Sequence, residues 1–319
     1  MLPSWISQLP LPKIDFAPRS SIGIAIGTRE VCAVRLSSRR DEWHLEWSRQ
    51  ADLDAPMFQG APSTEAVSAL EKAVAAVCEG AAREFIPVHV SLPDPAGVIA
   101  VFELDDLPKT RAAQLNLVSW RLTREHYGDD RPLRCACQTL GQQDGKQLLL
   151  GMALEASWQG AVREGLRRAG VVPWTMNVAT GYRFNRFYPL LTSERNSGAI
   201  VALDPDAWTL ALWDADGRLR WLRGRWREHL PADGAVYDAI AVETERAILA
   251  YVHGGGDRRV ERVYVAGGDE TAALAAALDR RLRERCVPLT ADMGQAAGSN
   301  SGKPLAALME TALSAAAAG

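Results

Sequence analysis

The sequence predicts an α/β protein made of two similar halves with a cleft between them. The chain has 319 residues, about twice the usual size of one domain. Near its start, Ile22, Ile24 and Ile26 alternate with small residues and stop at Gly27, which is typical of a buried strand ending in a turn. The same three-strand opening returns after a polar break at 191–198. This duplication favours two like lobes, and a cleft between lobes is the usual place for a ligand.

The first half is predicted to begin with three strands and continue into mixed helix and strand. Its first helix has an apolar stripe at spacings of three and four, with Ser63 or Thr64 as the N-cap. Gly170 stands where a later helix ends. The expected strands are 22–27, 31–36, 43–47, 88–92, 98–104, 133–140 and 147–154. The expected helices are one that carries the apolar stripe at 67, 70, 74 and 77, and those at 110–127, 157–169 and 177–188.

The second half repeats the opening and then alternates helix with strand. Its expected strands are 199–203, 208–213, 219–226 and 260–266. Its expected helices are 235–253, 270–285 and 304–315, with a polar loop at 292–303. A chain of this length can bury a substantial core without disulfide bonds or a bound metal.

Composition narrows the class of protein. Apolar residues make up 47% and charged residues 24%, as in ordinary globular proteins. The net charge of −3 gives no general attraction to nucleic acid or acidic lipid. No apolar run reaches the roughly 18–20 residues that span a bilayer. The segment 1–10 is broken by prolines and lacks a basic region, so it is not typical of a secretory signal; it either packs on its own domain or touches a partner or membrane.

The five cysteines follow neither a disulfide framework nor a zinc-site spacing. Cys135 and Cys137 lie in an expected strand, which places both on one face. We interpret them as buried, reduced thiols, in keeping with a reducing compartment.

Two glycine turns are candidate anion sites. Gly23, Gly27 and Thr28 belong to the first strand and its turn, while Gly267 and Gly268 stand between a strand and a helix. Backbone N–H groups at such turns and at helix N-termini can face an anion. Each turn alone is weak evidence, because a strand that merely contains glycine has the same pattern.

Three other patterns have simpler interpretations. The stretch 298–303 looks like a phosphate loop but has the wrong glycine spacing and Pro304 in place of Ser or Thr, so we expect a loop there. The arginines and tryptophans of 218–227 suit nucleic acid or an acidic membrane, but are more typical of a solvated strand whose arginines pair with nearby acids. Asp105 and Asp106 suit a turn better than acid–base chemistry.

Several segments, taken in order, resemble the actin-like ATPase superfamily. Gly-Ile-x-Ile-Gly-Thr at 23–28, followed by Val-x-Ala-Val-x-Leu at 31–36, resembles its first phosphate loop. The chain is more closely similar to the PilM-type proteins of type IV pilus assembly, with the related MshI and HofM-like proteins. This resemblance runs through 90–94, 102–108, 148–153, 162–171 and 263–268.

The resemblance implies a bilobed actin-like ATPase fold, a duplicated ribonuclease H-like α/β architecture with a subdomain inserted in the first lobe. The implied divisions are an N-terminal tail at 1–20, a first lobe at 21–92 with part of the C-terminal segment, the insert at 93–190, the second lobe at 191–290, and a loop and returning helix at 291–319.

The resemblance also implies a cytoplasmic scaffold, peripheral at the inner membrane, in a type IV pilus or a related competence or secretion machine. It would bind the cytoplasmic tail of a PilN-like membrane protein and meet other platform components and motor ATPases. Nucleic acid is not an expected partner. The alternative is an active actin-like ATPase or a sugar-kinase-like enzyme.

Departures from the family pattern bear on the cleft. Where the family has an acidic residue in each phosphate loop, this chain has Ala25 and Ala202, with Asp204 displaced by two positions. Those carboxylates organise Mg²⁺ and the attacking water, and Trp208 is expected to crowd a phosphate. We therefore expect no catalytic residue and no metal ligand. ATP with Mg²⁺ would bind weakly at most, and the candidate contacts are Gly23, Gly27, Thr28, Asp204, Gly267 and Gly268.

Overall fold

The structure of the chain is a computed structural model. It describes residues 20–39, 42–80, 86–127, 131–143, 145–192, 196–231, 235–253, 259–289 and 307–317. The N-terminal segment and the loop at 298–303, both considered above, lie outside the described residues. Within the described part, no helix is both long and apolar enough to cross a bilayer.

The first sheet has the strand order β3-β2-β1-β4-β8. Its first three strands pair antiparallel, and β4 and β8 run parallel to β1. Alternation along β1 sets its two faces, with Ile24 toward α1 and α3 and Ala25 toward α8. The elements are β1 Ser20–Ile26, β2 Glu30–Arg39, β3 Glu42–Asp52, β4 Val88–Leu92, β8 Thr175–Val178, α1 Thr64–Val77, α3 Ala156–Arg168 and α8 Ala307–Ala317.

The second sheet repeats this order as β11-β10-β9-β12-β13, so the predicted duplication is confirmed. It again combines an antiparallel meander with two parallel strands. Helices α5 and α6 cover one face and α4 the other. The elements are β9 Gly198–Leu203, β10 Ala207–Trp213, β11 Leu219–Trp226, β12 Arg262–Ala266, β13 Arg285–Pro288, α4 Ala179–Thr192, α5 Ala235–His253 and α6 Thr271–Asp279.

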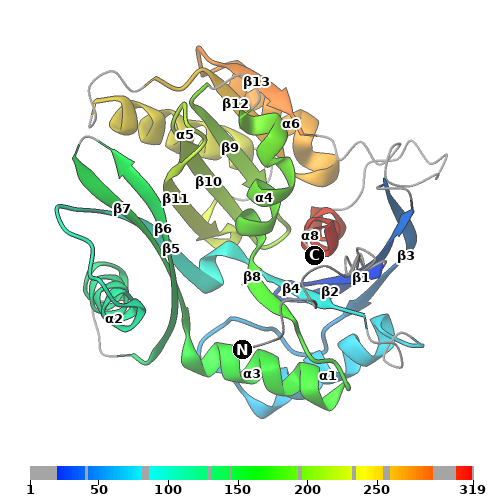
Figure 1. The fold of residues 1–319 in the computed structure, drawn as a ribbon. Helices are drawn as coiled ribbons and strands as arrows, with labels where there is room; N and C mark the ends of the chain where they lie inside the picture. Colours follow the sequence, from blue (N-terminus) through cyan, green and yellow to red (C-terminus); the bar gives the residue numbers. More distant parts are fainter. Residues whose placement is uncertain are drawn as a thin grey trace, which may run out of the picture.

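Helices α4 and α8 lie against each other between the two sheets (Figure 1). α4 follows the last strand of the first sheet, yet its Phe184, Phe187 and Leu191 pack on the second sheet. α8 comes from the C-terminal end of the chain and packs on the first sheet through Ala312 and Leu313. The first half therefore takes an inner helix from a distant part of the chain, whereas the inner helix of the second half directly precedes β9.

A third, three-stranded sheet has the order β5-β7-β6, from β5 Gly97–Leu104, β6 Leu133–Gln143 and β7 Lys146–Glu155. Helix α2, Arg111–Leu122, packs on one face and is capped by the Thr110 hydroxyl, which accepts from the Ala113 N–H at 3.2 Å. Cys135 and Cys137 share that face, as predicted. The expected insert at 93–190 stays a prediction, and this separate sheet occupies 97–155 within it.

Two short strands differ from the predicted elements. The helix expected at 177–188 is preceded by β8 and begins only at Ala179. The helix expected at 270–285 ends at Asp279, and the chain then forms β13. Both strands have four residues and lie at sheet edges, where parallel pairing to β4 and β12 decides their conformation. Local periodicity does not carry that information.

The cysteines are all unpaired thiols. Burial raises the pKa of Cys32 to about 12, that of Cys78 to about 11 and that of Cys286 to about 12. Thiols with such pKa values stay protonated at neutral pH and are poor nucleophiles. Cys32, Cys78, Cys137 and Cys286 are buried in the core, whereas Cys135, expected to be buried, is half-exposed.

Candidate functional site in the cleft between the halves

A cavity of about 740 Å³ lies where the two halves meet. The first half lines it with Thr28 and Arg29 from the β1–β2 turn and with Phe58. The second half contributes Asp206 from the β9–β10 turn, together with residues 226–228, 230–231 and 236–237. The β1–β2 turn and the β9–β10 turn, which the duplication makes equivalent, thus line the same cavity.

The β1–β2 turn presents its hydrogen-bond donors to a carboxylate of the other half. The Thr28 N–H donates to Oδ2 of Asp206 at 2.6 Å, and the Thr28 hydroxyl donates to Oδ1. The turn itself is fixed, because Gly27 N–H donates to the Glu30 carbonyl at 2.8 Å and Met57 N–H donates to the Thr28 carbonyl at 2.8 Å. Asp206 therefore accepts two hydrogen bonds from one predicted site residue, Thr28, by lying over the Gly27–Thr28 peptide.

The second glycine turn does not line the cavity, but its Glu270 is bonded to two residues that do, Arg227 and Tyr237. Gly268 adopts a left-handed φ of 56°, which suits glycine, and Glu270 follows in the short 3₁₀ turn η5, Gly268–Glu270. Both Glu270 oxygens accept from Arg227 at 2.8 Å, and Tyr237 donates to one of them at 2.8 Å. The Arg227 hydrogen bonds hold the pKa of Glu270 below its usual range. The guanidinium of Arg227 is thus already paired.

Two predicted site residues lie elsewhere. Asp204 is buried and accepts from Arg183 of α4, at 2.8 Å for Oδ2, and from the Thr311 hydroxyl of α8 at 3.2 Å. Gly23 lies under α8, where an added Cβ would stand 1.9 Å from the Ala312 carbonyl oxygen. Trp208 is buried in the core beneath α5 and does not line the cavity, so the expectation that it crowds a phosphate is wrong. Asp206, not Trp208, lines the cavity.

The two alanines in the acidic positions are fully buried. Ala25 packs among apolar residues under α8, and Ala202 packs in the cluster beneath α4. A carboxylate at either position would lose its hydration with no partner supplied by these apolar neighbours. The surroundings of both positions are therefore adapted to a methyl group.

Asp94 is a buried carboxylate that sequence reasoning did not identify as a site residue. It lies in the turn after β4 and accepts from the Thr180 N–H at 2.9 Å, the Thr180 hydroxyl at 2.6 Å and the Thr209 hydroxyl at 2.7 Å. These bonds tie the first half to α4 and β10. Burial is the main effect on the pKa of Asp94 and raises it, and the negative charge of Asp204 raises it further. The hydrogen bonds from Thr180 and Thr209 lower this pKa, but by less than the rise. In the sequence, the position of Asp94 between two prolines in a turn was the feature that could have identified it.

Because folding raises the pKa of Asp94, ionisation of this group disfavours the folded state. Its contribution to stability is complete below the unfolded pKa of about 4 and is lost as the pH rises through the folded pKa. In Asp94→Asn the amide oxygen still accepts from Thr180 N–H and the amide N–H donates to a threonine hydroxyl, without a charge. We expect the stability of Asp94→Asn relative to wild type to increase with pH in urea titrations from pH 4 to 8. Parallel pH profiles of Asp94→Asn and wild type would contradict the raised pKa of Asp94.

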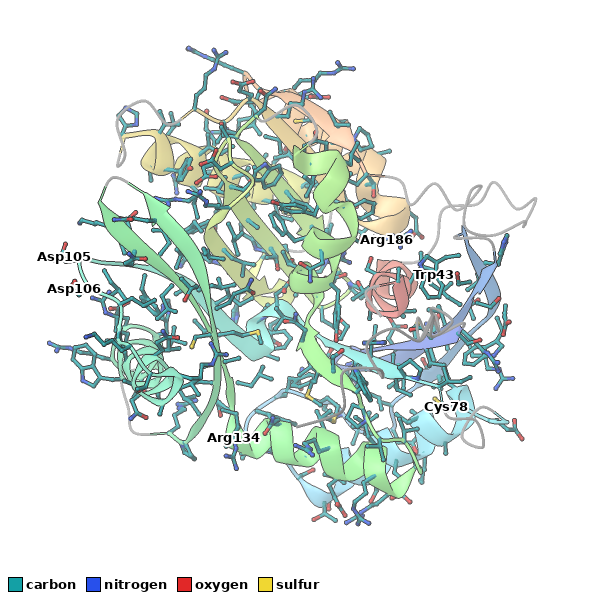
Figure 2. The ribbon with its side chains drawn as sticks, in the orientation of Figure 1. Trp43, Cys78, Asp105, Asp106, Arg134 and Arg186 are labelled. Carbon is teal, nitrogen blue, oxygen red and sulfur yellow. The ribbon has the colours of Figure 1, made fainter. Side chains whose placement is uncertain are left out.

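Arginines of the 218–227 segment form ion pairs, which confirms that part of its simpler interpretation, whereas the expectation of a solvated strand is wrong. Arg220 pairs with Glu103 of β5 at 2.7 Å, Arg225 with Glu243 of α5 at 3.0 Å, and Arg227 with Glu270. The strand also packs closely on the Asp94 turn at Gly224, so it is half-buried and not a solvated face. Asp105 and Asp106 are exposed beside α2, far from the cleft (Figure 2).

A second cavity, of about 600 Å³, lies between the three-stranded sheet and the rest of the molecule. The sheet lines it with residues such as Gln138 of β6 and Met152 of β7, and α4 lines it with Phe184 and Tyr188. The β10–β11 turn and Leu222 close the remaining side. We call this cavity the α4–β6 groove.

Sequence comparison identifies no relative, since no protein-family model and no curated protein matches the chain. The fold, however, is similar to solved structures. A Bacteroides thetaiotaomicron protein described as having an actin-like ATPase fold and unknown function matches with a TM-score of 0.55 and 9% identity, covering 86% of this chain and 93% of that one. The ethanolamine utilization protein EutJ from Carboxydothermus hydrogenoformans matches with a TM-score of 0.51 and 12% identity, covering 97% and 92%.

Two sheets of the same order around a central cleft, together with these matches, define an actin-like ATPase fold. The fold class implied by the sequence resemblance is confirmed. The structure titled "PilM-PilN type IV pilus biogenesis complex" is similar over nearly the whole of both chains, at 93% of this chain and 97% of that one. Its TM-score is 0.70 and its sequence identity 19%.

Proposed function

We propose that the protein is a cytoplasmic scaffold of a type IV pilus or a related competence or secretion machine, peripheral at the inner membrane. The observation that carries this proposal is the likeness to the PilM-PilN complex structure across 93% of the chain, which includes the third sheet as well as the two halves. The partner would be the cytoplasmic tail of a PilN-like membrane protein. Other platform components and motor ATPases would then be reached through this assembly.

The α4–β6 groove is the place we propose for the tail. Its floor and walls combine apolar side chains, including Leu150, Met152 and Leu222, with polar ones at Gln138 and Asn185. An extended peptide has side chains of both kinds on alternate faces. In addition, β6 is an edge strand that pairs only with β7 among the described strands. A tail in the groove could add to this edge through backbone hydrogen bonds.

Tyr188 tests this placement. It lies at the groove rim, 43% exposed, and stacks edge-on against Phe184 with ring centroids 5.7 Å apart. Tyr188→Ala is expected to weaken binding of a synthetic PilN-like tail peptide by about tenfold or more in fluorescence anisotropy, as for an aromatic anchor in an interface.

The matched control for Tyr188→Ala is Trp120→Ala. Trp120 is likewise an exposed aromatic residue, at 57%, but it lies on α2, on the opposite face of the three-stranded sheet. This variant should bind the tail like wild type. Equal losses in both variants would contradict the groove, and absence of wild-type binding at high micromolar peptide would contradict the scaffold proposal itself.

We also propose that the cleft does not hydrolyse ATP. The alternative, an active ATPase or sugar-kinase-like enzyme, needs an acidic metal anchor in each half. The apolar surroundings of Ala25 and Ala202 support the proposal, as does the commitment of Asp204 to Arg183 and Thr311.

A further inference from the structure

The Gly27–Thr28 turn has the features of a small anion site. Its Thr28 N–H and hydroxyl point at one place, and both are fixed by the backbone bonds of the turn. Glycine at position 27 leaves room there, since an added Cβ would stand 2.8 Å from Oδ2 of Asp206. Oriented backbone and hydroxyl donors beside a glycine commonly hold phosphate or carboxylate oxygens.

The anion at this place is part of the chain itself. Asp206 is 178 residues away in sequence, and the second half holds it rigidly. Its carbonyl accepts from the Arg227 N–H at 2.7 Å, and the turn is closed by the Asp204 N–H, which donates to the Ala207 carbonyl at 2.7 Å. Both donor and acceptor are therefore pre-positioned by their own halves of the molecule.

The electric field at the turn also disfavours a second anion. Glu30, which ends the turn, has its pKa raised by burial and next by the negative charge of Asp206. Two carboxyl groups therefore lie beside the donors. The arginine with which the second half lines the cavity, Arg227, already forms a bidentate pair with Glu270. A phosphate chain at the turn would therefore meet two acidic groups, with Arg227 engaged on the side of the second half and Arg29 exposed at the cavity wall on the side of the first.

We propose that Asp206 is the resident anion of the cleft, its carboxylate filling the site on the Gly27–Thr28 turn that a phosphate group would otherwise fill. The contact joins the two halves and excludes phosphate-bearing ligands from the turn. This inference deepens the proposed function, since it supplies a reason why an actin-like cleft in a scaffold needs no nucleotide to stay closed. It concerns a different surface from the α4–β6 groove.

The test is thermal unfolding of the full chain with millimolar inorganic tripolyphosphate, against sodium chloride of equal ionic strength. Wild type is expected to show the same midpoint in both solutions. Asp206→Ala is expected to unfold a few degrees lower in sodium chloride and to recover part of that loss in tripolyphosphate, because the freed donors then bind the added anion and stabilise the folded state. Asp54→Ala, which removes an exposed carboxylate paired with Lys72 at 3.3 Å, is the control and should behave like wild type.

Two outcomes would overturn the proposal. One is an equal response of wild type and Asp206→Ala to tripolyphosphate, which would mean that the carboxylate does not fill the site. The other is no response in Asp206→Ala, which would make the contact a simple hydrogen bond between halves. If Asp206→Ala does not fold, Asp206→Ser, whose shorter side chain likewise removes the carboxylate from the Thr28 donors, is read by the same criteria. Tail binding, measured separately, distinguishes a failure here from a failure of the scaffold proposal.

Discussion

Replacement of Arg183 by alanine is expected to lower the free energy of unfolding by about 3–5 kcal/mol, the usual cost of removing one partner of a buried ion pair. The side chain of Arg183 is 0% exposed and that of Asp204 is 8% exposed. Without the guanidinium, Asp204 would keep only the Thr311 hydroxyl among its hydrogen-bond partners described above. Urea unfolding at neutral pH measures the loss.

An exposed ion pair of the same residue types provides the control for Arg183. Arg280 pairs with Asp238 at 3.0 Å, and both side chains are about two-thirds exposed, at 65% and 67%. Arg280→Ala should change the free energy of unfolding by less than about 1 kcal/mol, since solvent screens such pairs. A comparable cost for Arg183→Ala and Arg280→Ala would mean that the buried network does not hold α4, β9 and α8 together.

Gly23→Ala is expected to be the second most damaging change, at about 3 kcal/mol, the upper part of the range for overpacked cores. The new methyl group would stand 1.9 Å from the Ala312 carbonyl oxygen and 2.6 Å from the Ala316 nitrogen. Both are backbone atoms of α8, so no side chain can turn aside and the helix must shift as a unit. Limited proteolysis should show α8 released, and urea unfolding should give the energy.

Gly160→Ala separates this clash from the general effect of replacing glycine. Gly160 is exposed in α3, and an added Cβ would meet nothing within 4 Å. Alanine there should stabilise the protein by about 0.5–1 kcal/mol through its better helix propensity. If Gly23→Ala were as harmless as Gly160→Ala, α8 would not pack on β1 as described.

Much of the fold was predictable because its signals are local. The strands at 88–92 and 219–226 and the helix at 235–253 have the bounds expected from periodicity and turn residues. The repeated meander revealed the duplication for the same reason. The edge strands β8 and β13 were not predictable, because each has only four residues and forms through pairing with a partner far away in sequence.

The candidate site was predictable only in part. Gly27 and Thr28 are at the cleft, as their turn pattern indicated, whereas Gly23, from the same motif, serves the packing of α8. The sequence offered no means to separate these roles, because the difference depends on which face of β1 meets α8. The partnership of Thr28 with Asp206 joins positions 178 residues apart and was likewise beyond local patterns.

The packing of the C-terminal helix α8 on the first sheet has a consequence for how the protein is made. As the chain leaves the ribosome, the first sheet can pair its strands and bury the face under α1 and α3, but the face that receives α8 stays uncovered until residues 307–317 have been synthesised. Contacts of such long sequence separation form late and slowly. A nascent chain stalled after the second sheet would therefore expose an apolar surface, and such surfaces are where aggregation begins and where chaperones bind.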